Sequence, residues 1–247
     1  MGIFVFLFGL VFGSFANVLI DRGDDISVLT DRSHCDFCKK NLSWFELIPI
    51  FSFVFQRGRC NTCKKKLSIQ YPLVELVMGL AFLLVYSLFA LQSDFSLVFY
   101  LLLTFAFVVL FIADLKYYIL PDSMIVLSLF CIIAIYFLSP VNPLPYLISA
   151  IGAGGFFFCL WLITKGRGMG FGDVKLACVM GLLLGYPKII VALYIAFLTG
   201  ALYGVILILG KKKTLKSAVA FGPFLLFGLA LSVYFGDRII QLWQTFH

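Results

Sequence analysis

The chain has 247 residues, of which 62% are hydrophobic and only 13% are charged. Soluble domains carry roughly a quarter charged residues, so this composition excludes an ordinary soluble protein and indicates an integral membrane protein. The formal net charge of +7 does not indicate nucleic-acid binding, because the basic residues gather in short segments between apolar stretches and form no basic face.

Eight apolar stretches predict an all-α polytopic membrane protein with about eight transmembrane helices. Proline, glycine and polar residues separate most consecutive stretches, and such short links favour antiparallel neighbouring helices. The sixth stretch is too short for a secure span. The predicted helices cover residues 3–20, 72–91, 95–113, 122–139, 144–164, 174–186, 187–209 and 220–236.

Within this pattern we expect three parts. Residues 1–20 form a first transmembrane helix, because the basic residue Arg22 follows the apolar run, whereas in a signal peptide the basic residues precede it. Residues 21–71 form the one sizeable polar loop, and residues 72–247 form a multi-span membrane domain.

The distribution of basic residues predicts how the helices are oriented. Of the nineteen lysines and arginines, nine lie in the loop 21–71, and the others follow the third, fifth and seventh predicted helices, except for Lys188 and Arg238. Cytoplasmic loops carry an excess of lysine and arginine. The N-terminus is therefore expected outside, with the loop 21–71 in the cytoplasm.

Four cysteines in this loop predict a metal site. They form two CxxC pairs, Cys35 with Cys38 and Cys60 with Cys63, separated by twenty-one residues. This spacing is typical of a zinc ribbon, in which four thiolates close a tetrahedron and leave no open position for catalysis, so we expect a structural zinc ion. Two disulfides are the alternative, which the reducing cytoplasm disfavours.

Lysines flank both cysteine pairs and would offset the negative charge of a four-thiolate zinc centre. They can also contact anionic lipid head groups or form an ordinary solvated surface. These residues are Lys39, Lys40, Lys64, Lys65 and Lys66.

Two aspartates lie where apolar helices meet charged segments, Asp114 at the end of the third predicted helix and Asp173 before the sixth. A carboxylate at the edge of the hydrocarbon layer loses hydration, so it is rare unless it is paired, neutralised or used. No histidine lies in the predicted helices to activate a serine or cysteine nucleophile. Two carboxyl groups that share one proton can hydrolyse a peptide bond without a metal, which indicates an aspartic protease.

Other interpretations of these aspartates remain. Asp173 can cap the sixth predicted helix, and Asp122, after Pro121, is a clearer helix cap. The aspartates can also be ion sites of a transporter or channel, although such sites usually lie nearer the middle of the bilayer. A non-catalytic assembly factor built around the zinc loop is a third class.

Several glycines are spaced so that backbone segments can approach one another closely. Three of them, Gly168, Gly170 and Gly172, precede Asp173 and allow a close approach of another segment. Pairs with the GxxxG spacing predict close helix contacts in lipid. These pairs are Gly9/Gly13, Gly181/Gly185 and Gly200/Gly204.

The two aspartate motifs carry a family resemblance. Asp-x-x-x-x-x-Leu-Pro-Asp at 114–122 and Gly-x-Gly-Asp at 170–173 resemble the type IV prepilin leader peptidases, membrane aspartic proteases of the GxGD class. The segment 13–20 is similar to that family's N-terminal motif, and Tyr71-Pro72 and Glu75 stand where the family has similar residues.

This resemblance implies roles for specific residues. It makes Asp114 and Asp173 the catalytic dyad, with Asp122 secondary. It also implies zinc binding by the four cysteines of the polar loop, which are Cys35, Cys38, Cys60 and Cys63.

The resemblance also implies an activity. The family cleaves the leader peptide of prepilin or pseudopilin precursors at the cytoplasmic face of the bacterial inner membrane. Many members then methylate the new N-terminal amine with S-adenosylmethionine. We therefore expect precursor substrates, a lipid bilayer and a methyl donor as partners, and no nucleic acid. The sequence indicates no residues for the methyl-donor site.

Overall fold

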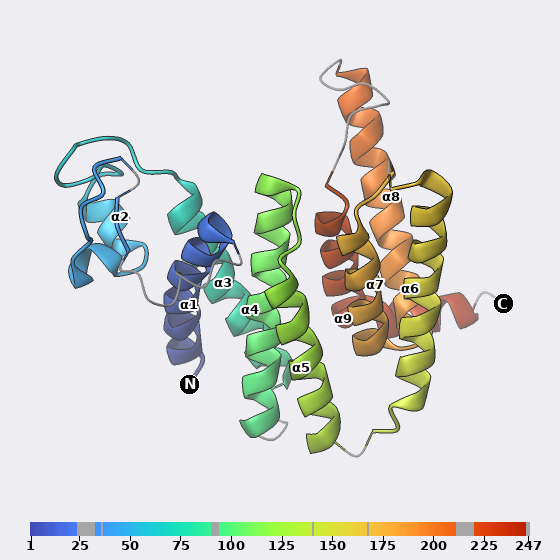
Figure 1. Ribbon diagram of the computed structural model, residues 1–247. Helices are drawn as coiled ribbons and strands as arrows, with labels where there is room; N and C mark the ends of the chain where they lie inside the picture. The colour runs from blue at the N-terminus through green and yellow to red at the C-terminus, as the bar shows by residue number, and fades with distance from the viewer. Residues whose placement is uncertain are drawn as a thin grey trace. The chain divides into compact units, whose positions relative to one another are not determined.

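The computed structural model describes residues 1–23, 33–35, 37–89, 94–139, 141–166, 168–210 and 220–245. In these residues the regular elements are helices, and extended pairing is limited to two isolated bridges, which confirms the expected all-α class. The helices are α1 (Gly2–Arg22), the 3₁₀ helix η2 (Trp44–Leu47), α2 (Phe51–Phe55), α3 (Gln70–Phe89), α4 (Asp94–Tyr117), α5 (Asp122–Leu138), α6 (Leu144–Thr164), α7 (Phe171–Leu184), α8 (Lys188–Leu209) and α9 (Gly222–Thr245) (Figure 1).

Six helices of the described chain are long and apolar enough to cross a membrane, namely α1, α3, α4, α6, α8 and α9. The protein is therefore a multi-pass membrane protein. The other two predicted spans form shorter helices, because α5 has 17 residues and α7 has 14. At 1.5 Å per residue, α7 extends only about 21 Å, which is less than the hydrocarbon thickness.

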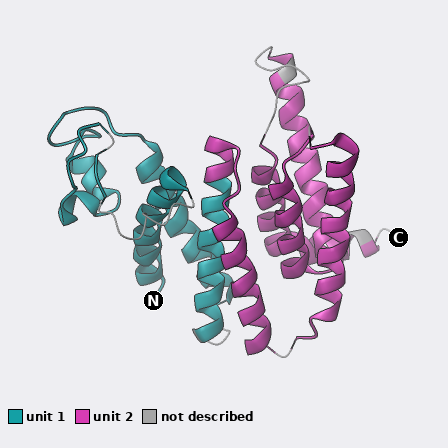
Figure 2. Ribbon diagram, viewed as in Figure 1, with its two compact units in different colours: residues 1–112 teal, residues 113–247 magenta. Residues whose placement is uncertain are grey.

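The chain divides into two compact units, Met1–Ile112 and Ala113–His247 (Figure 2). In unit 1, α1 packs along α3. The contact is close because a Cβ atom on Gly13 would lie 2.5 Å from the Cα of Glu75, and one on Gly9 would lie 2.8 Å from the Cα of Gly79. The first GxxxG pair therefore packs helices together, as expected.

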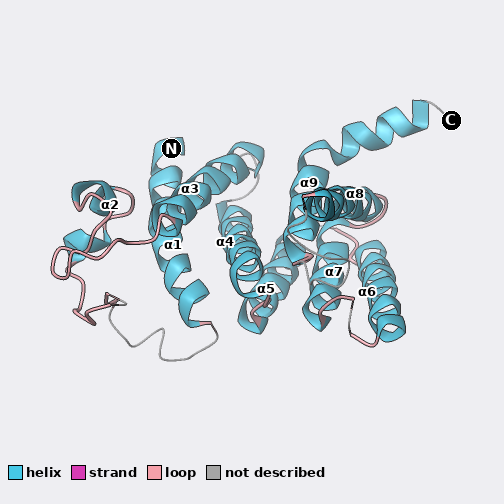
Figure 3. Ribbon diagram, turned by 90° about the horizontal axis from the view of Figure 1, so that it is seen from above, coloured by secondary structure: helices cyan, strands magenta, loops and turns pink. Residues whose placement is uncertain are grey.

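The other helices of unit 2 pack around α7, which is the shortest of its α-helices. This helix contacts α5, α6, α8 and α9, and the view from above shows it among them (Figure 3). Its side chains Leu176, Ala177 and Met180 are fully buried. A helix that is apolar on all sides and enclosed by neighbours needs no amphipathic pattern.

The other glycine pairs behave differently from the expectation. Gly181 packs tightly, but Gly185 lies after the end of α7 with φ of 66°, so it ends the helix. No heavy atom of the described residues lies within 4 Å of a Cβ atom built on Gly204, and the nearest of them at Gly200 is in the ring of Phe221, at 3.3 Å. The expected close backbone contact at the third pair is therefore wrong for Gly204.

Several residues used for the sequence interpretation lie outside the described residues. They include Asp36 between the first two cysteines, and the basic residues Arg32, Arg167, Lys211, Lys212, Lys213 and Lys216.

Replacement of Gly181 tests the packing of α7. A Cβ atom there would lie 2.6 Å from both the Cα of Ala150 and the carbonyl oxygen of Ser149 in α6. Because backbone atoms cannot move aside as a flexible side chain can, Gly181→Ala should destabilise the protein by about 1–3 kcal/mol. The measurement is thermal unfolding in detergent.

Gly155→Ala in α6 is the matched control, since a Cβ atom there meets nothing within 4 Å. Alanine has the higher helix propensity, so this variant should be as stable as the wild type or more so. Equal unfolding temperatures for the two variants would contradict the close α6–α7 contact.

Candidate functional site

The side chains of Asp114 and Asp173 are both buried within unit 2. Asp114 lies in the last turn of α4 and is 5% exposed, whereas Asp173 lies in the first turn of α7 and is 6% exposed. The two carboxylates are close enough to interact electrostatically. The structure therefore brings together two buried acidic side chains that are 59 residues apart in the sequence, from Asp114 to Asp173.

Glycines and one leucine allow this approach. A Cβ atom on Gly222, at the start of α9, would lie 2.6 Å from Oδ2 of Asp114 and 3.3 Å from Cδ2 of Leu120. A Cβ atom on Gly172 would lie 3.1 Å from Cβ of Leu120. Leu120 thus lies against both Gly172 and Gly222, and any larger side chain at Gly222 would press on the Asp114 carboxylate.

The start of α9 is held by an aromatic cluster. The ring of Phe221 lies 6.0 Å from that of Phe157 in α6 and 5.2 Å from that of Phe197 in α8, measured between centroids. Phe157 is fully buried. Because Phe221 directly precedes Gly222, this cluster determines where the backbone of Gly222 lies relative to Asp114.

The two carboxylates have different partners. The Gly170 backbone N–H donates to Oδ2 of Asp173 at 3.2 Å. Because α7 begins at Phe171, its N-cap is Gly170, and Asp173 is the third residue of the helix and not the N-cap that was expected before Val174. Oδ2 of Asp114 is buried and accepts no hydrogen bond from any residue that the structure describes. The backbone N–H of Gly222 lies against this carboxyl group, and water or a substrate group can complete its hydrogen bonding.

Asp122 does not have the capping role expected from the sequence. Pro121 is the N-cap of α5, and Asp122 is the first residue of the helix. Its carboxylate oxygens instead accept hydrogen bonds from Nζ of Lys175 in α7, at 2.7 and 2.8 Å. This ion pair joins two helices that are distant in the sequence. It is exposed and lies apart from the buried carboxylates.

The four cysteines of the polar loop form a cluster in unit 1. The Sγ atoms of Cys35, Cys38, Cys60 and Cys63 all lie within 4.8 Å of one another, and all four are free thiols. Bonds of ~2.3 Å to a tetrahedral zinc ion would separate two sulfurs by ~3.8 Å. Sγ of Cys35 lies 3.9 Å from Sγ of Cys63, so this donor set fits a zinc ion.

The two cysteine pairs lie in turns with the same backbone pattern. In the first turn the N–H of Cys35 donates to the carbonyl of Lys40, and the N–H of Lys39 donates to that of Cys35. In the second turn Cys60 and Lys65 pair in the same way. The backbone N–H groups of Cys63 and Thr62 lower the pKa of the Cys60 thiol to about 6, which favours the thiolate that binds metal.

Glu46 links the two turns. Its carboxylate accepts hydrogen bonds from the Ser43 N–H at 2.9 Å and from Nδ2 of Asn61 at 3.0 Å, and it lies 3.7 Å from Nζ of Lys40. The Ser43 backbone hydrogen bond is the main reason why the pKa of Glu46 is lowered. Lys40 therefore pairs with Glu46, while Nζ of Lys65 lies 4.6 Å from the centre of the Phe37 ring.

A hydrogen bond to Glu75 connects the polar loop to α3. This buried residue of α3 accepts a hydrogen bond from the Ile50 N–H at 2.7 Å. His34, which directly precedes Cys35, lies outside the thiol cluster, and its Nδ1 is 3.2 Å from Nη2 of Arg22.

Sequence reasoning missed Gly222 and Glu46. Gly222 could have been found because a glycine between Phe221 and Pro223 is typical of a constrained helix start. Glu46 could have been found because the spacing of Ser43 and Glu46 is that of a capping box.

Comparison with known proteins gives two family matches that together cover most of the chain. The bacterial Peptidase A24 N-terminal domain matches residues 7–89, and the type IV leader peptidase family matches residues 100–205. No solved structure was found to match.

Curated relatives agree with these matches over nearly their full length. The prepilin leader peptidase/N-methyltransferase of Bacillus subtilis (strain 168) is 31% identical over 97% of this chain and 96% of the relative. The protein of the same name from Aeromonas salmonicida (strain A449) is 31% identical over 98% and 93%, and that from Pseudomonas putida is 27% identical over 94% and 89%. The chain is therefore a member of the type IV leader peptidase family.

Proposed function

We propose that this protein cleaves the leader peptide from prepilin or pseudopilin precursors with Asp114 and Asp173 as the catalytic dyad. The observation that carries the proposal is the burial of these two electrostatically interacting carboxylates in the matched peptidase region. None of the relatives named above is a transporter, so the alternative of an ion site has no support from them.

The proposed reaction needs one ionised and one protonated carboxyl group. Two adjacent carboxylates ionise together only at high cost, so one proton is retained by the pair. The ionised carboxylate takes a proton from a water molecule, whose oxygen attacks the scissile carbonyl carbon. The protonated carboxyl donates its proton to the carbonyl oxygen. The tetrahedral intermediate then collapses, and the leaving amine takes a proton from the dyad.

The orphan oxygen of Asp114 supports this scheme. Oδ2 is buried without a partner among the described residues, and the glycine at 222 leaves room beside it. A water molecule or a substrate carbonyl in this position would satisfy it. Asp173 is held by the Gly170 N–H, so the pair combines one fixed carboxylate with one that is open to substrate.

We further propose that Cys35, Cys38, Cys60 and Cys63 bind a structural zinc ion. The ion would hold the two turns together and supply stability that a loop of this size cannot obtain from a hydrophobic core. The closed set of four thiolates leaves it no part in hydrolysis.

The proposed orientation places the N-terminus outside and the zinc loop and both aspartates in the cytoplasm of a bacterium. The support is the segregation of basic residues in the sequence. This arrangement requires α5 and α7 to cross or enter the membrane along with the six longer helices, so the predicted total of eight stays part of the proposal.

The names of the relatives support a second activity, N-methylation of the new terminal amine with S-adenosylmethionine as donor. When bound, the donor would supply the methyl group that the new amine receives. Methylation therefore follows cleavage, because the amine exists only after the peptide bond is broken.

Conservative substitutions test the dyad. Asp114→Asn and Asp173→Asn each remove a carboxylate with little change in shape, so each should lower prepilin cleavage by at least about a thousandfold. Cleavage is measured with the purified protein in lipid and a precursor substrate. Asp122→Asn, which breaks only the exposed pair with Lys175, should cleave like the wild type. Substantial activity in either dyad variant would overturn the assignment.

Gly222→Ala tests the space beside Asp114. The added methyl group would lie 2.6 Å from Oδ2, so the carboxylate must move. Because a displacement of about 1 Å can reduce a rate about a hundredfold, we expect at least about a tenfold fall in kcat. Gly204→Ala, whose Cβ atom meets nothing within 4 Å, should cleave at the wild-type rate. Equal rates for both variants would contradict the close approach of α9.

Elemental analysis of the purified protein tests the metal. The wild type should contain about one zinc ion per chain, because four thiolates complete one tetrahedral site. Cys60→Ser should lose most of the zinc and unfold at a lower temperature. Cys159→Ser, which changes an exposed thiol outside the cluster, is the control and should keep the metal. A zinc-free wild type with all cysteines reduced would count against the site.

A further inference from the structure

One side of the short helix α2 in unit 1 is apolar and exposed. Phe51, Val54 and Phe55 are all exposed, Phe55 to 83%. Their spacing, i, i+3 and i+4, places them on the same side of the helix. The residues between them, Ser52 and Phe53, instead line a cavity inside unit 1. The apolar side of a helix in a soluble domain faces the core, so α2 has the reverse orientation.

The preceding 3₁₀ helix η2 extends this apolar surface, because η2 and α2 pack against each other. Trp44 is 78% exposed, and its ring lies edge to face with that of Phe45, at 6.0 Å between centroids. A soluble surface seldom gathers so many large apolar side chains unless another surface covers them. The exposed residues that form what we call the apolar face are Trp44, Phe45, Phe51, Val54 and Phe55.

The packing of unit 1 fixes the depth of the apolar face. α1 has 21 residues and α3 has 20, so at 1.5 Å per residue each is about 30 Å long and just crosses the hydrocarbon layer. The Ile50 N–H, directly before α2, donates to Glu75 at 2.7 Å. Glu75 lies about 7.5 Å along α3 from its first residue, Gln70. The two helices of the loop therefore lie beside the α1–α3 pair and not beyond its end (Figures 1 and 3).

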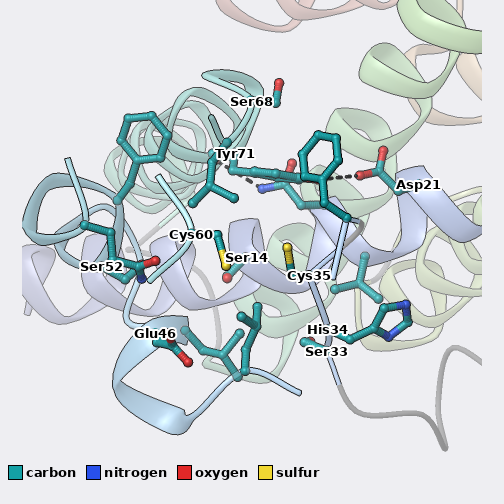
Figure 4. A pocket seen from close by; sticks show the side chains of 18 of the residues that line it. Ser14, Asp21, Ser33, His34, Cys35, Glu46, Ser52, Cys60, Ser68 and Tyr71 are labelled. Atoms are coloured by element: carbon teal, nitrogen blue, oxygen red, sulfur yellow. Dashed lines mark hydrogen bonds between the residues drawn. The ribbon is translucent and has the colours of Figure 1, made fainter. Parts of the chain in front are cut away.

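The cavity on the inner side of η2 and α2 extends to a similar depth. Its volume is about 560 Å³, and Figure 4 shows Ser14, Glu46 and Ser52 among the residues that line it. Ser14 lies in α1, about 12 Å before the last residue of that helix, Arg22. The polar side of η2 and α2 thus faces the spanning helices across the cavity, and the apolar face points outward at the level where α1 and α3 leave the hydrocarbon.

The backbone of α2 can enter the edge of the lipid without leaving polar groups unpaired. The N–H groups of Ser52, Val54 and Gln56 each donate to the carbonyl four residues earlier, at 2.9–3.1 Å. Because a backbone group without a partner is costly in hydrocarbon, this internal pairing is what a lipid-facing segment requires.

The charges beside the apolar face favour an anionic surface. Arg57 and Arg59 follow α2 directly, and both are exposed. Between Trp44 and Arg59 the sequence has a single acidic residue, Glu46, which is buried. Guanidinium groups bind phosphate through paired hydrogen bonds, so anionic phospholipid head groups fit this edge of the face.

We propose that the apolar face docks on the bilayer in which the chain itself is anchored. Its aromatic side chains lie at the boundary between head groups and acyl chains, where tryptophan is enriched in membrane proteins, and Arg57 and Arg59 bind anionic lipid phosphates. The surface is continuous with the lipid-exposed sides of α1 and α3, so the polar loop is held at the membrane by its own side chains as well as by its two ends. The inference goes beyond the proposed reactions and does not depend on them.

Quenching of tryptophan fluorescence by brominated lipids tests the docking in the full-length protein. Nanodiscs that hold one chain each exclude a second copy as the cover. The emission of Trp44 is the difference between the wild type and Trp44→Phe. It should fall by about half or more when bromine lies near the head-group end of the acyl chains, and by less when bromine lies at their far end, because interfacial side chains lie about 5–10 Å deep.

Thr62→Trp is the matched control, because Thr62 is an exposed residue of the second cysteine turn, outside the apolar face. The tryptophan that it introduces should keep its emission with either lipid, while zinc content and thermal unfolding show that the variant is folded. If neither lipid quenches Trp44, or if both positions are quenched equally, the docking is overturned. Emission of Trp44 that changes only after a prepilin precursor is added would also overturn it and assign the face to a protein partner.

Arg57→Gln combined with Arg59→Gln tests the role of lipid charge. Each basic residue near an anionic surface favours docking by about fivefold. The double variant should therefore show less quenching of Trp44 than the wild type in anionic nanodiscs, and equal quenching in neutral ones. Arg238→Gln, which removes an exposed arginine of α9, is the control and should match the wild type in both. Wild-type quenching of the double variant in anionic nanodiscs would overturn the phosphate contacts.

Discussion

The burial of two carboxylates at adjacent helix ends is the constraint on which unit 2 depends. Hydrocarbon surroundings make a charged carboxylate costly, so each must have a hydrogen-bond donor, share a proton or meet a substrate group. Asp173 obtains a donor because it lies in the first turn of α7, where the backbone N–H of Gly170 is free to cap it. Asp114 lies at the opposite kind of end, the last turn of α4, where backbone carbonyls prevail. Its backbone donor comes instead from another helix, since the N–H of Gly222 at the start of α9 lies against its carboxyl group.

The remainder of unit 2 keeps this pair in position. α7 must be enclosed for Asp173 to be buried, and Gly181 allows α6 to pack against it at backbone distance. The Phe157, Phe197 and Phe221 cluster holds the start of α9, which brings Gly222 against Asp114. The exposed pair of Asp122 with Lys175 joins α5 to α7 near the same end. Packing of apolar helices therefore determines the geometry of a polar site, and the polar residues of the site contribute little of the packing themselves.

The sequence predicted those parts of the molecule whose signal is local. The CxxC spacing predicted the clustering of the cysteines, and the lengths of the apolar runs predicted the helices, with α7 short. It did not predict which faces meet, because membrane helices that are apolar on all sides lack the periodic pattern that marks a buried face. For that reason the contact of Gly222 with Asp114, the absence of any contact at Gly204 and the pairing of Asp122 with Lys175 appeared only in the structure.

The two units place their polar side chains in different surroundings. Hydrolysis needs a buried pair of acids, which unit 2 supplies from helix ends that long apolar helices hold rigid. The loop of unit 1 instead carries many polar side chains of both signs around its cavity. Such side chains are expensive within hydrocarbon but not at its edge, where α1 and α3 meet the cysteine turns. A loop there has no core of its own, so the hydrogen bonds of Glu46 and Glu75 and the clustering of four cysteines hold its turns together and against α3.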